Sequence, residues 1–229
     1  MAQRALEKYL REPVRKLGEG GFGSVWSDGK RAFKVVQLRN RRDIRDLRLE
    51  CEYGQRAFEF GVGPRLYHCW TMPPNWGVIE MQQMQMTLRQ YLTKVSPHSH
   101  SWVPLLEQRI RQLNQAGMYC VDLALRNAML NVNKRGAISQ LRLVDFGSDY
   151  CDQEKRNPLA IPSMLAIFWF NVRPYVQDLP PLMTWRKLVA RHVQKLSNKD
   201  RQLIFFEVCR VVQVKFQPSR QTFEKDMLQ

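Results

Sequence analysis

The pattern of apolar and polar positions divides the chain into a strand-rich first part and a mainly helical remainder. Residues 2–11 have the spacing of a short helix, and several short alternating segments follow that are typical of strands. The predicted strands are 14–19, 24–27, 31–38, 65–71 and 76–81. A longer helix is predicted over about 41–60, where it ends at Gly61 and Gly63. We therefore expect a small N-terminal lobe with a five-stranded antiparallel sheet plus one helix.

From residue 87 onward the pattern is mainly helical. The predicted elements are helices over 88–95 and 103–115, then a strand hairpin over 128–132 and 141–144. Residues 158–227 suggest about three further helices. The apolar run at 158–170 is shorter than the roughly 20 residues that a membrane-spanning helix needs. It is typical of a buried helix, and we expect no membrane span.

The length of 229 residues suits one domain with a substantial core better than two large independent domains. A hydrophobic content of 44% and a charged content of 25% are ordinary for a globular protein. We predict a single α+β domain over residues 1–229, with a small lobe at about 1–81 and a reduced, mainly helical lobe at about 87–229. The Gln- and Met-rich stretch at about 82–86 is the expected hinge between them.

A formal net charge of +15 favours anionic partners, such as a nucleotide, an acidic protein, a nucleic acid or an anionic membrane surface. The densest run of basic residues is Arg39, Arg41, Arg42, Arg45 and Arg48. Asp43 and Asp46 interrupt this run at the spacing of helical ion pairs. We interpret the run as the solvated face of a helix, so that nucleic-acid binding is possible but not favoured.

The chain has five cysteines, an odd number, and none of them are spaced as C-x-x-C. This pattern predicts neither a disulfide framework nor a zinc site, and it favours a reducing compartment. The first residues alternate charged and apolar side chains and lack the apolar core of a signal peptide. We therefore expect a cytoplasmic or nuclear location.

Three short motifs carry candidate chemistry. They are G-x-G-x-x-G-x-V at 18–25, D-L-x-x-x-N at 122–127 and D-F-G at 145–147. Glycines let a backbone loop approach a phosphate closely and present its N–H groups to the anion. A carboxylate can orient a hydroxyl nucleophile and accept its proton, and carboxylate and amide oxygens are ligands that Mg²⁺ prefers.

In this order the motifs resemble the nucleotide loop, catalytic loop and metal-binding motif of the eukaryotic-type protein kinase family. The resemblance covers about residues 14–150 and implies a bilobal protein-kinase-like fold that binds ATP and Mg²⁺. The nucleotide contacts that it implies are Gly18, Glu19, Gly20, Gly21, Phe22, Gly23 and Val25, with the backbones of Glu80 and Gln82 beside Ile79 as gatekeeper. It further implies Asp122 as catalytic base, Arg126 as a supporting cation, and Asn127 and Asp145 as Mg²⁺ ligands.

Lys34 ends an A-x-K segment in an apolar strand, where an unpaired ammonium is costly to bury. By the same resemblance it grips the α- and β-phosphates and pairs with a glutamate on the following helix. Glu50 and Glu52 both qualify. Helical periodicity places Glu50 on the apolar face with Leu47, and Glu52 on the charged face with Arg48. We predict that Glu50 is the partner.

The chain departs from the family pattern at several positions. Cys120 and Val121 stand where the family has His-Arg, and Ala124 stands where it has a lysine. Without the arginine, the usual receptor for a phosphorylated activation loop is missing. No A-P-E segment follows the third motif. This reduced part is similar to that of compact atypical kinases such as the RIO type, and residues 145–151 are similar to a segment of kinase-like proteins of large DNA viruses.

The function that the resemblance implies is Mg²⁺-dependent transfer of the γ-phosphate of ATP to a hydroxyl of a protein substrate, with serine or threonine as acceptor. The net charge of the chain suits an acidic or otherwise anionic substrate. Two alternatives remain open. One is a pseudokinase that binds nucleotide or a partner without turnover, and the other is a small-molecule kinase on the same fold.

Overall fold

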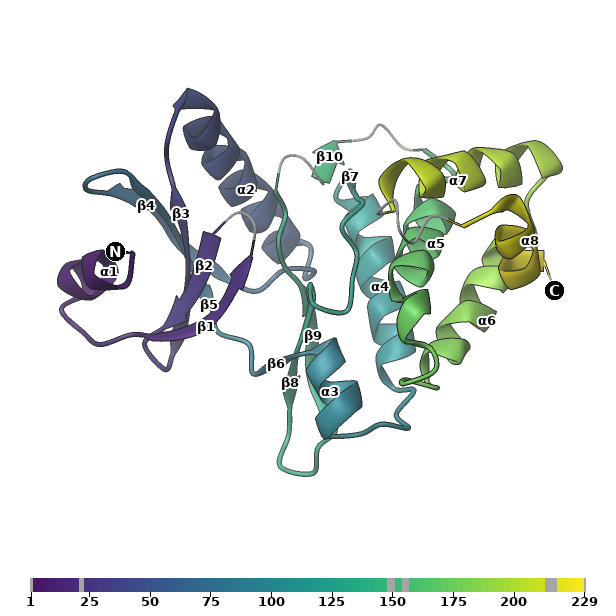
Figure 1. Cartoon of the computed structure of the whole chain (residues 1–229), viewed down its shortest axis with the longest axis horizontal. Helices are drawn as coiled ribbons and strands as arrows, with labels where there is room; N and C mark the ends of the chain where they lie inside the picture. The colour runs from purple at the N-terminus through teal and green to yellow at the C-terminus, as the bar shows by residue number, and fades with distance from the viewer. Residues whose placement is uncertain (1, 21–22, 148–150, 154–156, 213–217, 229) are drawn as a thin grey trace. The chain divides into compact units, whose positions relative to one another are not determined.

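Figure 1 shows the computed structural model of the chain, which describes residues 2–20, 23–147, 151–153, 157–212 and 218–228. The chain falls into two compact units, Met1–Met84 with Val144–Asp149, and Gln85–Leu143 with Tyr150–Gln229. The first break lies between Met84 and Gln85, within the stretch where the sequence predicts a hinge. The segment that begins at Val144 groups with the first unit, whereas the sequence analysis assigned it to the second lobe.

The first unit is built on a five-stranded antiparallel sheet, as predicted. Its strands are β1 (Arg15–Gly20), β2 (Gly23–Ser27), β3 (Arg31–Gln37), β4 (Leu66–Met72) and β5 (Trp76–Gln82), in the spatial order β1-β2-β3-β5-β4. Two helices accompany it, α1 (Ala2–Leu10) and α2 (Arg41–Glu59). The fold class α+β is therefore confirmed, and β4 is an edge strand of the sheet.

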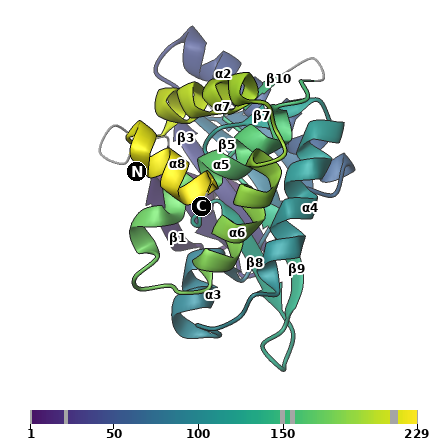
Figure 2. The ribbon, with the colours of Figure 1, turned by 90° about the vertical axis from the view of Figure 1, so that its right-hand side faces the viewer.

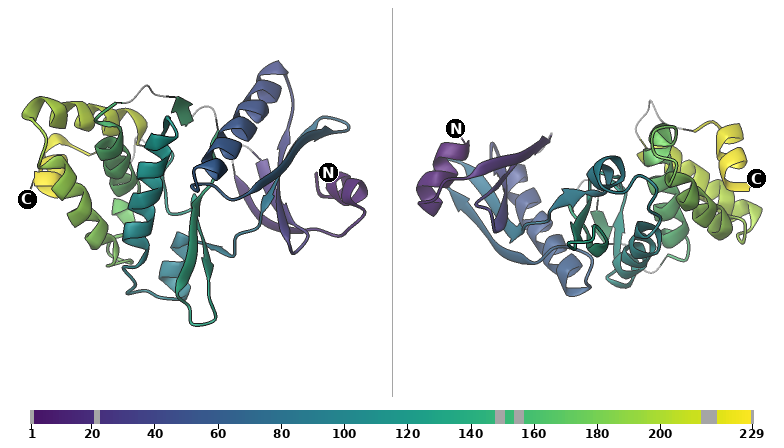
Figure 3. Two further views of the ribbon diagram at one scale, coloured as in Figure 1. Left: turned by 180° about the vertical axis from the view of Figure 1, so that it is seen from behind. Right: turned by 90° about the horizontal axis from the view of Figure 1, so that it is seen from below.

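The two helices of this unit cover opposite faces of the sheet (Figure 3), because side chains along a strand alternate between faces. Phe33 and Val35 point toward α1, whose Leu6 is buried with them in one apolar cluster. The side chain of Leu47 from α2 is buried in a second cluster, on the face that Lys34 shares. This alternation places the ammonium of Lys34 beneath α2.

Local signals explain where α2 begins and where its charges lie. The side chain of Asn40 caps the helix by accepting hydrogen bonds from the backbone N–H groups of Arg42 and Asp43, at 2.8 and 3.1 Å. The arginines at 41, 42, 45 and 48 are exposed, and Asp46 pairs with Arg42 at 3.5 Å. The basic run is thus a solvated helix face laced with ion pairs, as the sequence predicts.

The second unit begins with short strands and helices. They are β6 (Met86–Thr87), α3 (Leu88–Lys94), α4 (Trp102–Gln115), β7 (Met118–Cys120), β8 (Ala128–Val132), β9 (Ile138–Leu143) and β10 (Cys151–Gln153). Strands β6, β8 and β9 form one sheet, and β7 pairs with β10 in another. The predicted hairpin is present as β8 and β9, although β9 begins at Ile138 rather than at residue 141.

The rest of this unit is helical. Its helices are α5 (Ala160–Val172), α6 (Leu182–Val193), α7 (Asn198–Val211) and α8 (Arg220–Leu228), with a short 3₁₀ turn at Arg173–Tyr175. They lie together in Figure 2. The described residues form four α-helices here, whereas the sequence predicted about three. The short helix α8 is weakly amphipathic, so its sequence gives little helical signal. Helix α5 is almost entirely buried, as predicted. Across the described part of the chain, no helix is long and apolar enough to cross a membrane.

The prediction that the cysteines form no disulfide is wrong, because Cys51, Cys69 and Cys120 are all disulfide-bonded. Cys51 of α2 and Cys69 of β4 are joined by a disulfide, with 6.4 Å between their Cα atoms. The two residues are 18 positions apart in the sequence, and the packing of α2 against β4 brings them together. Cys209 is a thiol whose Sγ lies 3.8 Å from the carbonyl of Pro218. The cysteine pattern consequently no longer argues for a reducing compartment.

Candidate functional site

The glycine-rich segment forms the hairpin of β1 and β2, in which Gly18 lies opposite Val25 and Gly20 lies opposite Gly23. A Cβ atom at Gly18 or Gly20 would meet no other atom within 4 Å. Packing therefore does not require glycine at these two positions, and the hairpin surface above them is open to a close ligand. Of the predicted loop contacts, Gly21 and Phe22 lie outside the described residues.

Gly23 has a structural reason of its own to be glycine. Its φ is +150°, and a Cβ atom there would collide with the backbone carbonyl of Val35. Glu19 is exposed and its carboxylate lies 2.5 Å from the ammonium of Lys16. Val25 is directly opposite Lys34 in the pairing of β2 with β3, so that both side chains lie on the same face of the sheet.

Lys34 is the centre of a three-residue charge cluster within the first unit. Its Nζ lies 2.5 Å from Oε1 of Glu50 and 2.6 Å from Oδ1 of Asp145. The side chains of Lys34 and Glu50 are only 12% and 14% exposed, and that of Asp145 is 35% exposed. Burial alone would lower the pKa of Lys34, but the two carboxylates outweigh it and hold the pKa above its ordinary value. The ammonium is therefore a fixed positive charge.

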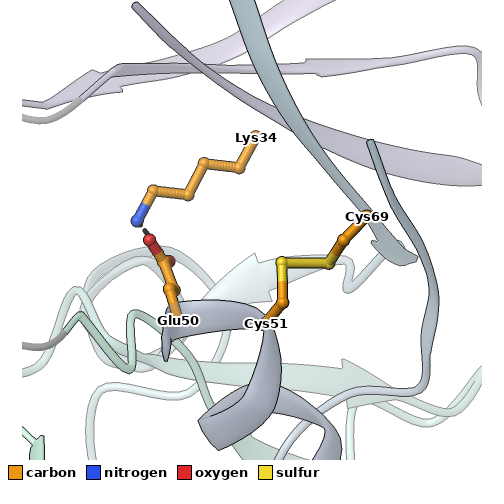
Figure 4. The surroundings of a disulfide bond; sticks show 4 residues. All are labelled: Lys34, Glu50, Cys51 and Cys69. Carbon is orange, nitrogen blue, oxygen red and sulfur yellow. Dashed lines mark hydrogen bonds and ion pairs between the residues drawn. A yellow bond between two sulfur atoms is a disulfide. The ribbon is translucent and has the colours of Figure 1, made fainter. Parts of the chain in front are cut away.

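Glu50 is the observed partner of Lys34, as helical periodicity predicted, whereas Glu52 is exposed. Figure 4 shows the Glu50 side chain pointing from α2 toward the Lys34 ammonium. Burial raises the pKa of Glu50, and the charge of Lys34 opposes that rise. Without Lys34, the buried carboxylate would have one acidic neighbour and no cation, so the pair depends on both members.

Asp145 adopts a backbone conformation that is uncommon for a residue with a side chain, with φ at +69°. It follows β9, separated from it only by Val144. Such conformations carry a cost of roughly 1 kcal/mol or more and persist where the surroundings hold them. Here the contact of the Asp145 carboxylate with Lys34 is one such restraint. The sequence predicts that Asp145 follows directly after a strand. In the structure it lies two residues after β9, and its carboxylate contacts the ammonium of Lys34.

A small pocket of about 30 Å³ lies beside this cluster, between α2, the sheet and the segment after β9. The residues that line it are Glu50, Gly54, Pro64, Leu66, Ile79, Met81, Val144, Asp145 and Phe146. Most of these side chains are apolar. Phe146 is buried and lies close to Gly63. Side chains thus leave a small gap beside Glu50 on the underside of α2.

The strand that leads to the predicted hinge differs from expectation in one contact. Ile79 is buried with Leu38 and Leu47 beneath α2, and the carboxylate of Glu80 accepts a hydrogen bond from Arg31 at 2.8 Å. The backbone N–H of Gln82 donates to the carbonyl of Arg65 at 2.7 Å. Because β5 still includes Gln82, this N–H is engaged within the sheet, which the sequence did not predict. The adenine contacts of the Glu80 and Gln82 backbones stay a prediction.

The second motif forms a compact group within the second unit. Asn127 donates its side-chain N–H groups to the backbone carbonyl and to Oδ2 of Asp122, both at 2.9 Å. Arg126 donates to Oδ1 of Asp122 at 2.6 Å. Asn127 is buried, and its amide oxygen is the atom left to meet a ligand. The predicted base, supporting cation and amide ligand are therefore neighbours in space.

A further residue that the sequence analysis did not identify holds this loop. Asn171, at the end of α5, donates its side-chain N–H to the backbone carbonyl of Leu123 at 3.0 Å. Leu123 directly follows Asp122, so the bond fixes the loop from the helix side. The one signal in the sequence was a polar residue closing a long apolar run, and that signal does not name a partner.

Within the described ranges, no group of three or more His, Cys, Asp or Glu side chains is placed to hold a metal ion. Asp145 and Asn127 nevertheless offer oxygen ligands of the kind that Mg²⁺ prefers. Compared with known proteins, the chain matches no protein-family model and no curated sequence.

Proposed function

We propose that the protein is an ATP-dependent protein kinase on a bilobal protein-kinase-like fold, which transfers the γ-phosphate of ATP to a serine or threonine hydroxyl. The observation that supports it most directly is the bonding of Lys34 to both Glu50 and Asp145. Two carboxylates from segments that the sequence analysis singled out separately, the helix after β3 and the D-F-G motif, converge on the one ammonium. A plain glycine-rich hairpin would not require this convergence.

In the proposed reaction the first unit binds the nucleotide. The open β1–β2 hairpin offers backbone N–H groups to phosphate, and Lys34 supplies a positive charge whose position its two carboxylates fix. Val25 shares the face of Lys34 and would cover the adenine ring. The backbones of Glu80 and Gln82 at the end of β5 would contact adenine, and the N–H of Gln82 would then leave the carbonyl of Arg65.

The second unit supplies the group that acts on the acceptor. Arg126 and Asn127 hold the carboxylate of Asp122, which can accept a hydrogen bond from a substrate hydroxyl and then its proton. Asn127 of the second unit and Asp145 of the first each offer an oxygen ligand of the kind that Mg²⁺ prefers, and a bound metal would supply charge neutralisation on the transferred phosphate. Transfer of the phosphoryl group otherwise depends on positioning and electrostatics.

A second candidate is a nucleotide-binding scaffold without turnover. The ion pair between Arg126 and Asp122, at 2.6 Å, favours it, because it engages the carboxylate that a kinase uses as its base. The two candidates agree on nucleotide binding and differ in turnover.

The test is incubation of the full chain with γ-labelled ATP and Mg²⁺, alone and with an acceptor protein. We expect label on protein, and a loss on the order of 10²–10⁴ in rate for Lys34→Met. Lys30→Met is the matched control, because Lys30 is an exposed lysine at the turn before β3. Binding of ATP without any labelling would favour the scaffold. Label only on small molecules would favour a small-molecule kinase.

A further inference from the structure

The disulfide of the first unit lies next to the ion pair of the candidate site. Cys51 follows Glu50 directly in α2, and its sulfur is bonded to Cys69 of β4. Figure 4 shows the two side chains leaving the same turn of the helix, Glu50 toward Lys34 and Cys51 toward Cys69. A covalent bond to the sheet therefore restrains the turn that presents the Glu50 carboxylate.

Apolar packing and the ion pair with Lys34 also hold this part of α2, whose Leu47, Tyr53 and Ala57 are buried. Leu47, one turn earlier, is buried in a small cluster with Leu38 and Ile79. Beyond it, the pocket described above borders both Glu50 and Gly54 on the underside of the helix. The pocket is small, and a gap of this size leaves the side chains around it with fewer packing contacts. The disulfide adds a covalent restraint to the turn that borders it.

The disulfide is also open to reaction. Cys69 is exposed on the edge strand β4, and Cys51 is half-buried. Exposed disulfides are the ones that thiols attack most readily, because the attacking thiolate must reach a sulfur atom. The disulfide therefore combines two features: it restrains the helix turn that carries Glu50, and one of its cysteines, Cys69, is exposed.

We propose that the Cys51–Cys69 disulfide is a redox-sensitive device that positions Glu50 against Lys34. The reductant is a dithiol, either a small molecule or a protein. One of its thiolates attacks the Cys69 sulfur to form a mixed disulfide, and Cys51 leaves as a thiolate that takes up a proton. The second thiol of the reductant then displaces Cys69 as a thiol. Two electrons pass to the protein, both cysteines end as thiols, and the reductant ends as its disulfide.

Reduction frees the central turn of α2 from β4. Glu50 then withdraws from Lys34, and Lys34 keeps Asp145 as its remaining partner. The Lys34 ammonium becomes more mobile and more accessible to solvent. It is then less well positioned to bind the phosphates of a nucleotide. The oxidised form is therefore the competent one. The consequence for phosphotransfer rests on the proposed function, whereas the movement of Glu50 does not.

The test compares the oxidised full chain, the same chain treated with dithiothreitol, and the Cys51→Ser/Cys69→Ser double variant. The first measurement is the rate at which an amine-reactive reagent labels Lys34, resolved by mass spectrometry from the other lysines. We expect this rate to rise several-fold on reduction and in the double variant, with no further effect of dithiothreitol on that variant. Cys209→Ser is the matched control and should respond as the wild type does.

The second measurement is ATP-dependent labelling of an acceptor protein. We expect a decrease of about tenfold on reduction, in the range of typical coupling between sites. Because dithiothreitol also reduces the disulfide of Cys120 near Asp122, the decrease is assigned to the Cys51–Cys69 bond through the Cys51→Ser/Cys69→Ser variant, which should show it without reductant. A response of Lys34 without phosphotransfer in any state leaves the device standing and overturns the proposed function. Unchanged Lys34 labelling, even with a lower melting temperature on reduction, makes the disulfide a structural bond only and overturns the device.

Discussion

Asn171 and Leu123 are joined by a hydrogen bond from the side-chain amide of the first to the backbone carbonyl of the second, at 3.0 Å. The bond links the end of α5 to the loop that carries Asp122. The backbone N–H of Asn127 closes the same loop by donating to the carbonyl of Ala124 at 3.0 Å. The position of the proposed base is thus set by a helix that contributes no reacting group.

Replacing Asn171 by leucine should therefore lower turnover while sparing nucleotide binding. The variant leaves the carbonyl of Leu123 without its donor, which costs about 1–3 kcal/mol when the group is buried. A misplaced carboxylate then lowers the rate of phosphotransfer by about 10- to 100-fold. Steady-state kinetics and ATP titration measure the two effects separately. Asn198→Ala, at an exposed position of α7, is the control. Loss of ATP affinity with unchanged turnover would contradict the assigned role.

The ion pair of Lys34 is tested by comparing Glu50→Gln with Glu52→Gln. Both changes remove one negative charge from α2, but only the Glu50 carboxylate contacts Lys34. We expect Glu50→Gln to lower phosphotransfer by about 10- to 100-fold, because the charge that grips the phosphates is no longer held in place. Glu52→Gln should resemble the wild type. Equal losses in the two variants would mean that the charge of the helix matters rather than this contact.

Much of the first unit could be predicted because its signals are local. Alternation of apolar residues identifies the strands of the five-stranded sheet, and helical periodicity separates Glu50 from Glu52 before any contact is known. What the sequence could not supply is proximity between distant positions. Cys51 and Cys69 have no diagnostic spacing, and only the packing of α2 against β4 brings them together.

The same limit applies to the second unit. Strands β6, β7 and β10 are two or three residues long, too short for any alternation to register. Asn171 was missed because its partner is a backbone carbonyl, and every residue has one. The engagement of the Gln82 N–H with Arg65 was likewise invisible, since it depends on where β5 ends relative to the start of β4.

Replacing Asp145 and Asp122 one at a time should affect two different properties, ATP binding and turnover. Asp145→Asn should weaken Mg²⁺-dependent ATP binding, because a neutral amide is a poorer ligand for a hard cation and leaves Lys34 with one carboxylate. Asp122→Asn should retain binding and lose turnover, because an amide cannot accept the proton of the acceptor hydroxyl. Titration with ATP, with and without Mg²⁺, distinguishes the variants. The opposite pattern would show that the roles of the two motifs are exchanged.

Asp226 gives a prediction that depends on the fold alone. Its carboxylate on α8 accepts hydrogen bonds from the indole N–H of Trp169 at 3.0 Å and from Arg173 at 2.6 Å. Arg186 adds a bond to the backbone carbonyl of Asp226 at 3.0 Å. The side chain of Asp226 is only 9% exposed, so that these groups meet away from water. Helix α8 is thus attached to α5 through the buried carboxylate of Asp226 and to α6 through its backbone carbonyl.

Asp226→Ala should lower the free energy of unfolding by about 2–3 kcal/mol, because it leaves a buried indole N–H and a guanidinium without their acceptor. Glu224→Ala is the matched control on the same helix. Its carboxylate pairs with Arg220 at 3.0 Å, but the two side chains are 49% and 68% exposed. An exposed pair of this kind contributes about 0–1 kcal/mol. Urea unfolding followed by tryptophan fluorescence measures both. If the two variants unfold at the same urea concentration, α8 is not held by Asp226, and its attachment must come from the apolar contacts of Phe223 and Met227, which are buried on the same helix.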